Sequence, residues 1–342
     1  PMRFQEWLSR DPVRQEVRFS FGSGKEGVGD LYLPDGSDGD NGDASYPAVV
    51  LFFGVIPAGR DDPRILDLSN ALARSGMDVL IPWSDVMTTS RRMDFEGADL
   101  LVGAFAFLES HPTVDASRIG ISGFCVGASY AALAAQDARI RDKVAYANLF
   151  GGYYDIRDLM VSVASNTRSY GGTVEPWQPR DDTREVFTVH LIEDLPDADE
   201  RDLLARVFMD GGSADEIDPA ALSQQAGLVH RLLSGVSRDE ANALFDLLPV
   251  EFLEDLARLS PNTLIGDLKA PVLIMHDRED TAIPLPESRR MAEALAGRGE
   301  VYYTEFSLFQ HLDPTAQLPL PSMVKELWKF YLHMYNVMRL GA

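Results

Sequence analysis

The residue best suited to covalent chemistry is the chain's one cysteine, Cys125, in the pentapeptide Gly123-Phe124-Cys125-Val126-Gly127. A nucleophile between two such glycines, with a strand before it and a helix after it, forms a sharp turn. The turn leaves the nucleophilic side chain exposed above the edge of a sheet. Residues 118–122 are typical of a short buried strand, and the small residues 128–135 are typical of a closely packed helix. The alternative is a buried, inert thiol between chance glycines. The two flanks favour a thiol nucleophile.

A thiol nucleophile needs a base for its proton, and the base needs an acid that orients it. In the strand–turn–helix arrangement these groups follow in the order nucleophile, acid, histidine, each in a loop at the carboxyl end of a strand. Asp280 follows the apolar run 272–276, and His311 follows the run 301–306. We therefore predict Asp280 as the acid and His311 as the base.

Other residues compete for these two roles. Asp280 could instead be an ordinary turn residue, and Asp277 is a rival acid that lies closer to the end of its strand. Five further histidines are placed less favourably, in other loops, helices or strand ends: His111, His190, His230, His276 and His333. Of the six histidines, His311 is the one in the loop that follows the acid.

The backbone around the nucleophile predicts the rest of the chemistry. The N–H groups at the start of a helix favour a thiolate at Cys125, and the Val126 N–H can hold the oxyanion formed when that thiolate attacks an acyl carbonyl. A second N–H is expected from Val55, in a glycine-containing loop after the strand 46–53. His311 would then protonate the leaving group and activate water. This chemistry requires no cofactor, and no cluster of His, Cys and carboxylate residues has metal-ligand spacing.

Strands and helices alternate on both sides of the pentapeptide, which predicts an α/β fold with a mostly parallel central sheet and helices on both faces. The expected strands cover residues 46–53, 78–82, 118–122, 143–149, 270–276 and 301–306, after a strand pair within 14–34. Helices are expected at residues 63–75, 94–110, 286–295 and 322–338.

The alternation stops between about residues 154 and 260, where the pattern is amphipathic and helical throughout. We interpret this stretch as an all-helical cap inserted into the core, so that 1–153 and 261–342 are the two parts of one α/β unit and 154–260 is the insertion. A tethered second domain is the alternative. Some aromatic and apolar residues could line an acyl pocket or simply fill the insertion's own core: Tyr153, Tyr154, Trp177, Phe187, Phe208 and Met209.

Bulk properties exclude several function classes. The formal net charge of −22 argues against a general basic surface for nucleic acid or anionic membrane. The single cysteine excludes an intrachain disulfide framework, no apolar run is long enough to span a bilayer, and the first residues lack the layout of a secretory signal. A cytoplasmic location and a small-molecule acyl substrate are therefore expected. The aromatic-rich helix 328–335 could form a homodimer face, although core packing is the favoured interpretation.

The chain resembles the α/β-hydrolase superfamily, and within it the dienelactone hydrolase-like branch that uses cysteine as the nucleophile. The resemblance covers about residues 14–153 and 260–335 and is strongest at 114–123 and at 270–284, whose pattern aligns Asp280 with the family's acid. It implies a Cys125–His311–Asp280 triad that hydrolyses an ester, lactone or thioester. This sequence departs from the branch at Asp277, where glycine is usual, at Phe53, where many relatives have histidine, and in its larger insertion.

Other functions stay open on the same scaffold. Polyhydroxyalkanoate synthases, which are acyltransferases, also carry a GxCxG turn, but they usually have glycine at the positions of Ala128 and Gln310. Hydrolysis of a C–C bond uses the same groups as ester hydrolysis. A catalytically inactive hydrolase that serves as a binding module is the alternative from a different class.

Overall fold

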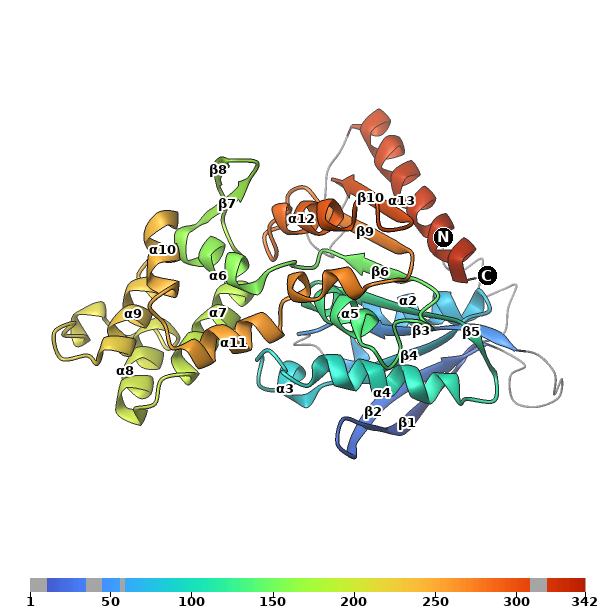
Figure 1. Cartoon of the computed structure of the whole chain (residues 1–342), viewed down its shortest axis with the longest axis horizontal. Helices are drawn as coiled ribbons and strands as arrows, with labels where there is room; N and C mark the ends of the chain where they lie inside the picture. The colour runs from blue at the N-terminus through green and yellow to red at the C-terminus, as the bar shows by residue number, and fades with distance from the viewer. Residues whose placement is uncertain (1–10, 35–44, 56–58, 308–318, 342) are drawn as a thin grey trace.

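One twisted sheet of eight strands organises the molecule (Figure 1). The computed structural model describes residues 11–34, 45–55, 59–307 and 319–341. The strand order is β1-β2-β4-β3-β5-β6-β9-β10, in which β1 and β2 pair antiparallel, β2 pairs antiparallel with β4, and the strands from β4 onward run parallel. Their bounds are β1 Val13–Phe21, β2 Lys25–Leu33, β3 Tyr46–Phe52, β4 Asp78–Trp83, β5 Val114–Phe124, β6 Ala147–Phe150, β9 Val272–Asp277 and β10 Val301–Phe306. The predicted α/β class is confirmed.

Helices cover both faces because side chains alternate along each buried strand. On β3, Val49 and Leu51 pack with α2 (Pro63–Arg74) and with Met338 of α13 (Leu320–Gly341). The residues between them, Ala48, Val50 and Phe52, point to the opposite face, which is covered by α4 (Gly97–Glu109), α5 (Val126–Gln136) and α12 (Pro286–Leu295). The central strands are therefore buried on both faces.

The insertion, residues 154–260, leaves the sheet after β6 and returns before β9, and it lies to one side of the core in Figure 1. Its helices are α6 Ile156–Ser165, α7 Asp181–Glu193, α8 Ala198–Phe208, α9 Gln224–Leu233, α10 Arg238–Phe245 and α11 Val250–Arg258. Buried residues of these helices, including Leu204 and Phe245, belong to the same hydrophobic cluster as the α4–α5 side of the sheet. The insertion and the core therefore share one hydrophobic cluster, and the cap stays a prediction.

The insertion was expected to be all-helical, but it also contains a hairpin of two strands, β7 (Thr167–Tyr170) and β8 (Thr173–Pro176). Gly171 and Gly172 form its two-residue turn, with φ of 58° and 81°. Such a Gly-Gly loop matches the twist of a hairpin. The sequence pattern missed these strands because neither is buried, so they carry no apolar alternation.

The last helix also differs from the expectation of core packing for its aromatic residues. Glu326, His333 and Val337 face the sheet, whereas Trp328 and Tyr331 are 60% and 56% exposed. Helical periodicity places these two sets on opposite faces of α13. The homodimer stays a prediction.

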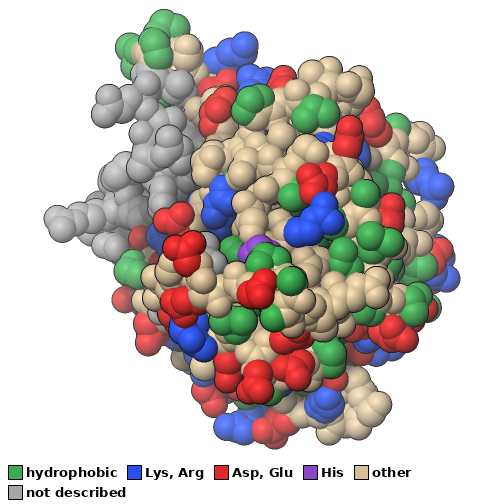
Figure 2. All heavy atoms as spheres, turned by 90° about the vertical axis from the view of Figure 1, so that its left-hand side faces the viewer, with side chains coloured by type: hydrophobic (Ala, Val, Ile, Leu, Met, Phe, Trp, Pro, Cys, Tyr) green, Lys and Arg blue, Asp and Glu red, His purple; other side chains and the backbone are tan. Residues whose placement is uncertain are grey.

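The surface carries both signs of charge despite the net charge of −22. On the side of the molecule toward the insertion, Figure 2 shows acidic and basic side chains interspersed with hydrophobic ones. None of the described helices combines the length and apolar character needed to cross a membrane.

Candidate active site

Cys125 occupies the turn between β5 and α5, as predicted. Its backbone has φ 55° and ψ −135°, a left-handed conformation that is uncommon for a residue with a side chain. The Cys125 N–H donates to the Phe150 carbonyl oxygen at 2.8 Å, which ties the turn to the end of β6. The half-buried thiol lines a cavity. A strained residue held this firmly beside a cavity is typical of a functional turn.

The glycines around the turn leave no room for a side chain. A Cβ on Gly123 would lie 2.2 Å from the Gly127 carbonyl oxygen, and a Cβ on Gly127 would lie 2.4 Å from the Phe52 carbonyl oxygen. The backbones of β5, α5 and the end of β3 are in direct contact here. This contact requires glycine at both ends of the pentapeptide.

The two predicted oxyanion donors, the N–H groups of Val126 and Val55, lie at the start of α5 and just after β3, where these two elements are in contact. Val126 is the first residue of α5, where N–H groups have no acceptor within the helix. Val55 follows β3 by way of Gly54, whose φ is 76° and whose Cβ would lie 2.4 Å from Val126 Cγ2 and 2.9 Å from the Gly127 nitrogen. Val55 and Val126 both line the cavity that Cys125 lines.

Asp280 lies in the loop after β9 and is 1% exposed. Its Oδ1 accepts hydrogen bonds from the N–H groups of Ala282 at 2.7 Å and Ile283 at 3.1 Å. A Cβ on Gly151, the residue that follows β6, would lie 3.3 Å from Asp280 Oδ2. The Cys125 N–H is hydrogen-bonded to Phe150, which also lies at the end of β6. The predicted nucleophile and the predicted acid therefore lie on either side of this one strand end.

The acid loop, residues 280–283, has a hydrogen-bond donor on each of its four carbonyl oxygens. Three donors come from the insertion: Trp177 Nε1 to Asp280 at 2.8 Å, the Arg180 N–H to Thr281 at 2.9 Å and Thr183 Oγ1 to Ala282 at 3.2 Å. The fourth is His276 Nε2 of β9, which is 3.0 Å from the Ile283 oxygen. The insertion and the sheet therefore hold the acid loop between them.

His276 is a buried support of this loop. Its Nε2 faces a carbonyl oxygen and therefore carries a proton, and its Nδ1 lies within hydrogen-bond distance of the Ser288 hydroxyl. The same Nε2 lies 3.6 Å from Asp280 Oδ2. The sequence places His276 at the end of a strand, and its position four residues before Asp280 is the signal that links it to this loop.

The rival acid, Asp277, is also buried, at 1% exposed. Its Oδ1 accepts the Glu279 N–H at 2.8 Å within its own turn. Asp280 Oδ2 is the carboxylate oxygen that lies beside Gly151 at the end of β6, and the role of Asp280 as the acid stays a prediction.

The predicted base, His311, lies outside the described residues. Among the other histidines, His333 Nε2 pairs with Asn148 Oδ1 at 2.9 Å in the interior. His190 of α7 lines the same cavity as Cys125, a position that the sequence analysis missed. Burial lowers the pKa of His190 to about 4, so its imidazole is neutral near pH 7.

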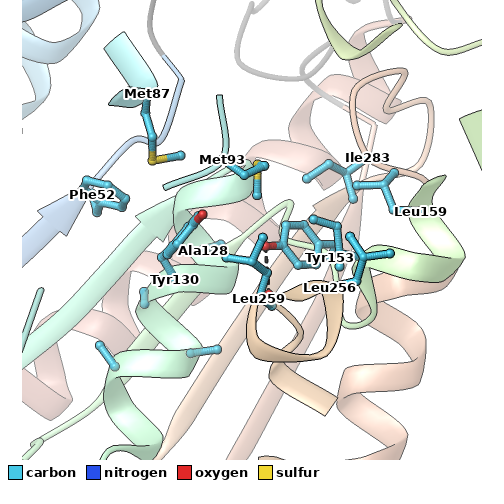
Figure 3. Packing of buried hydrophobic residues seen from close by; sticks show 14 of the residues in the cluster. Phe52, Met87, Met93, Ala128, Tyr130, Tyr153, Leu159, Leu256, Leu259 and Ile283 are labelled. Atoms are coloured by element: carbon cyan, nitrogen blue, oxygen red, sulfur yellow. Dashed lines mark hydrogen bonds between the residues drawn. The ribbon is translucent and has the colours of Figure 1, made fainter. Parts of the chain in front are cut away.

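The cavity beside Cys125 has a volume of about 420 Å³. Its lining comes from the nucleophile turn, from the insertion, and from the face of the sheet between α2 and α13. Tyr153 and Phe187 are in this lining, as expected for an acyl pocket, whereas Trp177 packs on the acid loop. Figure 3 shows Tyr153 between the α5 residue Ala128 and the insertion, its hydroxyl donating to the Leu259 oxygen at 2.9 Å.

No group of three or more His, Cys, Asp and Glu residues in the described part of the chain is arranged to hold a metal ion. No protein-family model matches the chain. A 46-residue segment is 50% identical to a probable 2-oxo-3-(5-oxofuran-2-ylidene)propanoate lactonase of Bradyrhizobium sp., covering 14% of this chain and 18% of that protein.

Solved structures match nearly the whole chain. An acylaminoacyl peptidase in complex with Z-Gly-Gly-Phe-chloromethyl ketone matches at a TM-score of 0.54 and 17% identity, over 96% of this chain and 42% of that one. The 2,6-dihydroxy-pseudo-oxynicotine hydrolase matches at 0.52 and 13%, over 95% and 69% of the two chains. DcsB in complex with its substrate analogue matches at 0.52 and 16%, over 95% and 100%. The chain has the α/β-hydrolase fold.

The α/β-hydrolase fold confirms the predicted architecture of a mostly parallel central sheet with helices on both faces. The chain spans about two-fifths of the length of the acylaminoacyl peptidase it matches. The dienelactone hydrolase-like branch and the cysteine mechanism stay predictions.

Proposed function

We propose that this chain is a hydrolase that cleaves a carboxylic ester, lactone or thioester through Cys125, His311 and Asp280. The observation that supports it most strongly is the left-handed Cys125, held between two glycines that admit no side chain and opening into a cavity. The hydrolase-fold neighbours and the lactonase segment support the same class of reaction. In this proposal the insertion acts as a cap on the site, and the protein works in the cytoplasm.

The proposed reaction has two stages. The Cys125 thiolate attacks the acyl carbon, and the Val126 and Val55 N–H groups stabilise the oxyanion. Collapse breaks the bond to the leaving group, which takes a proton from the His311 imidazolium, and leaves an acyl thioester on Cys125. His311 then removes a proton from water, which attacks the thioester and releases the carboxylic acid and the free thiol. Asp280 orients the imidazole and stabilises its charged form.

The test compares wild type with Cys125→Ala, His311→Ala and Asp280→Asn on p-nitrophenyl esters, lactones and acyl thioesters. We expect loss of turnover by about a thousandfold or more in the first two variants. Iodoacetamide should inactivate the wild type, and a slowly cleaved substrate should protect it. Turnover that survives in Cys125→Ala would reject the proposal.

The same assay separates the remaining candidate functions. Added alcohol or thiol acceptors that capture most of the acyl group would indicate an acyltransferase. Cleavage of a β-diketone with no ester cleavage would indicate a C–C bond hydrolase. An unreactive thiol and no turnover would indicate a binding module.

A further inference from the structure

Two helices of the insertion each present one face to the cavity beside Cys125. On α6 the lining residues are spaced at i, i+3, i+4 and i+7, which is one face of a helix: Ile156, Leu159, Met160 and Val163. On α7 the same spacing gives Thr183, Val186, Phe187 and His190. Six of these eight side chains are hydrocarbon or thioether, so the wall that α6 and α7 contribute to the cavity is apolar.

The charged residues in the described lining are matched in pairs. Asp62 and Arg64 lie 2.8 Å apart, and Arg91 and Glu185 also lie 2.8 Å apart. Arg180 and Asp182 lie 2.7 Å apart. Each guanidinium therefore already faces a carboxylate.

His190 adds no positive charge to this wall near pH 7, because burial keeps its imidazole neutral. A carboxylate on the substrate would therefore lose its hydration without gaining an unmatched cation among the described lining residues.

From this lining we infer that the acyl group of the substrate is apolar and uncharged, and that it lies against α6 and α7 while its carbonyl meets Cys125. The inference rests on the proposed function, since it names the substrate class of that site. The volume of about 420 Å³ lies within the range of small-molecule pockets, roughly 300–1,000 Å³, so the cavity accommodates a medium-length chain or a ring system. A carboxylate at the far end of the acyl group should be rejected.

Turnover tests the inference with matched acyl groups. We expect kcat/KM to rise from p-nitrophenyl butanoate to the octanoate by up to roughly fourfold per added methylene. The mono-p-nitrophenyl ester of suberic acid has the same chain length as the octanoate but ends in a carboxylate. It should be cleaved about a hundredfold more slowly than the octanoate. Equal rates for these two esters would overturn the inference.

Variants locate the acyl group. Leu159→Phe and Val163→Phe should shift the preference toward shorter chains, because the added ring occupies the cavity at the α6 wall. Leu247→Phe is the matched control, since Leu247 belongs to the insertion but is 60% exposed and outside the lining. Thermal unfolding of each variant checks its fold. Correctly folded α6 variants with an unchanged preference would also overturn the inference.

A binding measurement separates the failure of this inference from that of the proposed function. Calorimetric titration of Cys125→Ala with octanamide and with suberic acid monoamide needs no turnover. Tighter binding of octanamide would support the pocket assignment even if no ester is cleaved. In that case the absence of ester cleavage would reject only the proposed hydrolase function. Cysteine-dependent turnover with equal binding of the two amides would reject only the pocket assignment.

Discussion

At the scale of single residues, the glycines of the nucleophile turn are set by contact distances. Gly54, Gly123 and Gly127 each face backbone or a branched side chain at less than 3 Å from where a Cβ would stand. The sequence predicted this turn because its glycine spacing is local. It could not reveal that His190 lines the cavity, because that depends on which face of α7 packs inward.

Gly54→Ala should lower kcat by about a hundredfold, an effect comparable to the loss of one oxyanion donor. The new methyl group would push against Val126 and the Gly127 nitrogen, and so displace the proposed donors. Gly59→Ala is the matched control, because Gly59 has a similar φ of 69° and no atom of the described residues lies within 4 Å of the added carbon. Steady-state kinetics of both variants with one ester measure the difference. Equal losses would show that backbone strain alone is responsible.

At the scale of elements, the insertion contacts the acid loop as well as the cavity. Trp177, Arg180 and Thr183 reach this loop from about a hundred residues earlier in the chain. The helices of the insertion were predictable from amphipathic spacing within each segment. These contacts were not, because hydrogen bonds between distant segments leave no periodic signal.

Trp177→Phe should lower kcat about fivefold to tenfold while KM changes little, because one hydrogen bond, worth about 1 kcal/mol net, would no longer position the acid loop. Trp177 is a positioning residue in this argument, so the kcat-against-KM split is the informative readout. Trp83→Phe is the control: its Nε1 also donates at 2.8 Å, to Asp30, away from the cavity. A similar kcat loss in both variants would indicate a general structural effect.

At the scale of the whole molecule, one buried cluster runs through the sheet and the insertion. The fold class was predictable because alternating strands and helices with continuous apolar runs allow few other architectures. The β7–β8 hairpin and the exposed aromatic face of α13 were not predictable. Both depend on which residues pack against other elements in the folded chain, and the sequence pattern does not show this.

One buried carboxyl group gives stability a pH dependence. Asp78 is fully buried at the start of β4 and accepts the Thr113 hydroxyl at 2.5 Å. Burial raises the pKa of Asp78 from 3.8 to about 6. Between these values the folded chain holds a proton that the unfolded chain releases, so the free energy of unfolding falls as pH rises through this window.

We compare the free energy of unfolding of Asp78→Asn with that of wild type at pH 4 and at pH 7.5. The difference, variant minus wild type, should be larger at pH 7.5 than at pH 4, by at most about 3 kcal/mol. Urea unfolding at the two pH values measures this change. Asp67→Asn, at an exposed position on α2, serves as the control. A difference between Asp78→Asn and wild type that is the same at both pH values would contradict the assignment.

The donors on the acid loop also bear on how such a protein could be shortened. Joining residue 153 directly to residue 261 would keep every strand of the large sheet, yet it would remove three of the four donors that hold residues 280–283. A minimal enzyme would therefore need a redesigned acid loop. Changes that adapt the insertion to a new substrate would likewise have to preserve residues 177–183. The insertion therefore consists of a segment that must keep its contacts with the acid loop and a remainder that is free to diverge.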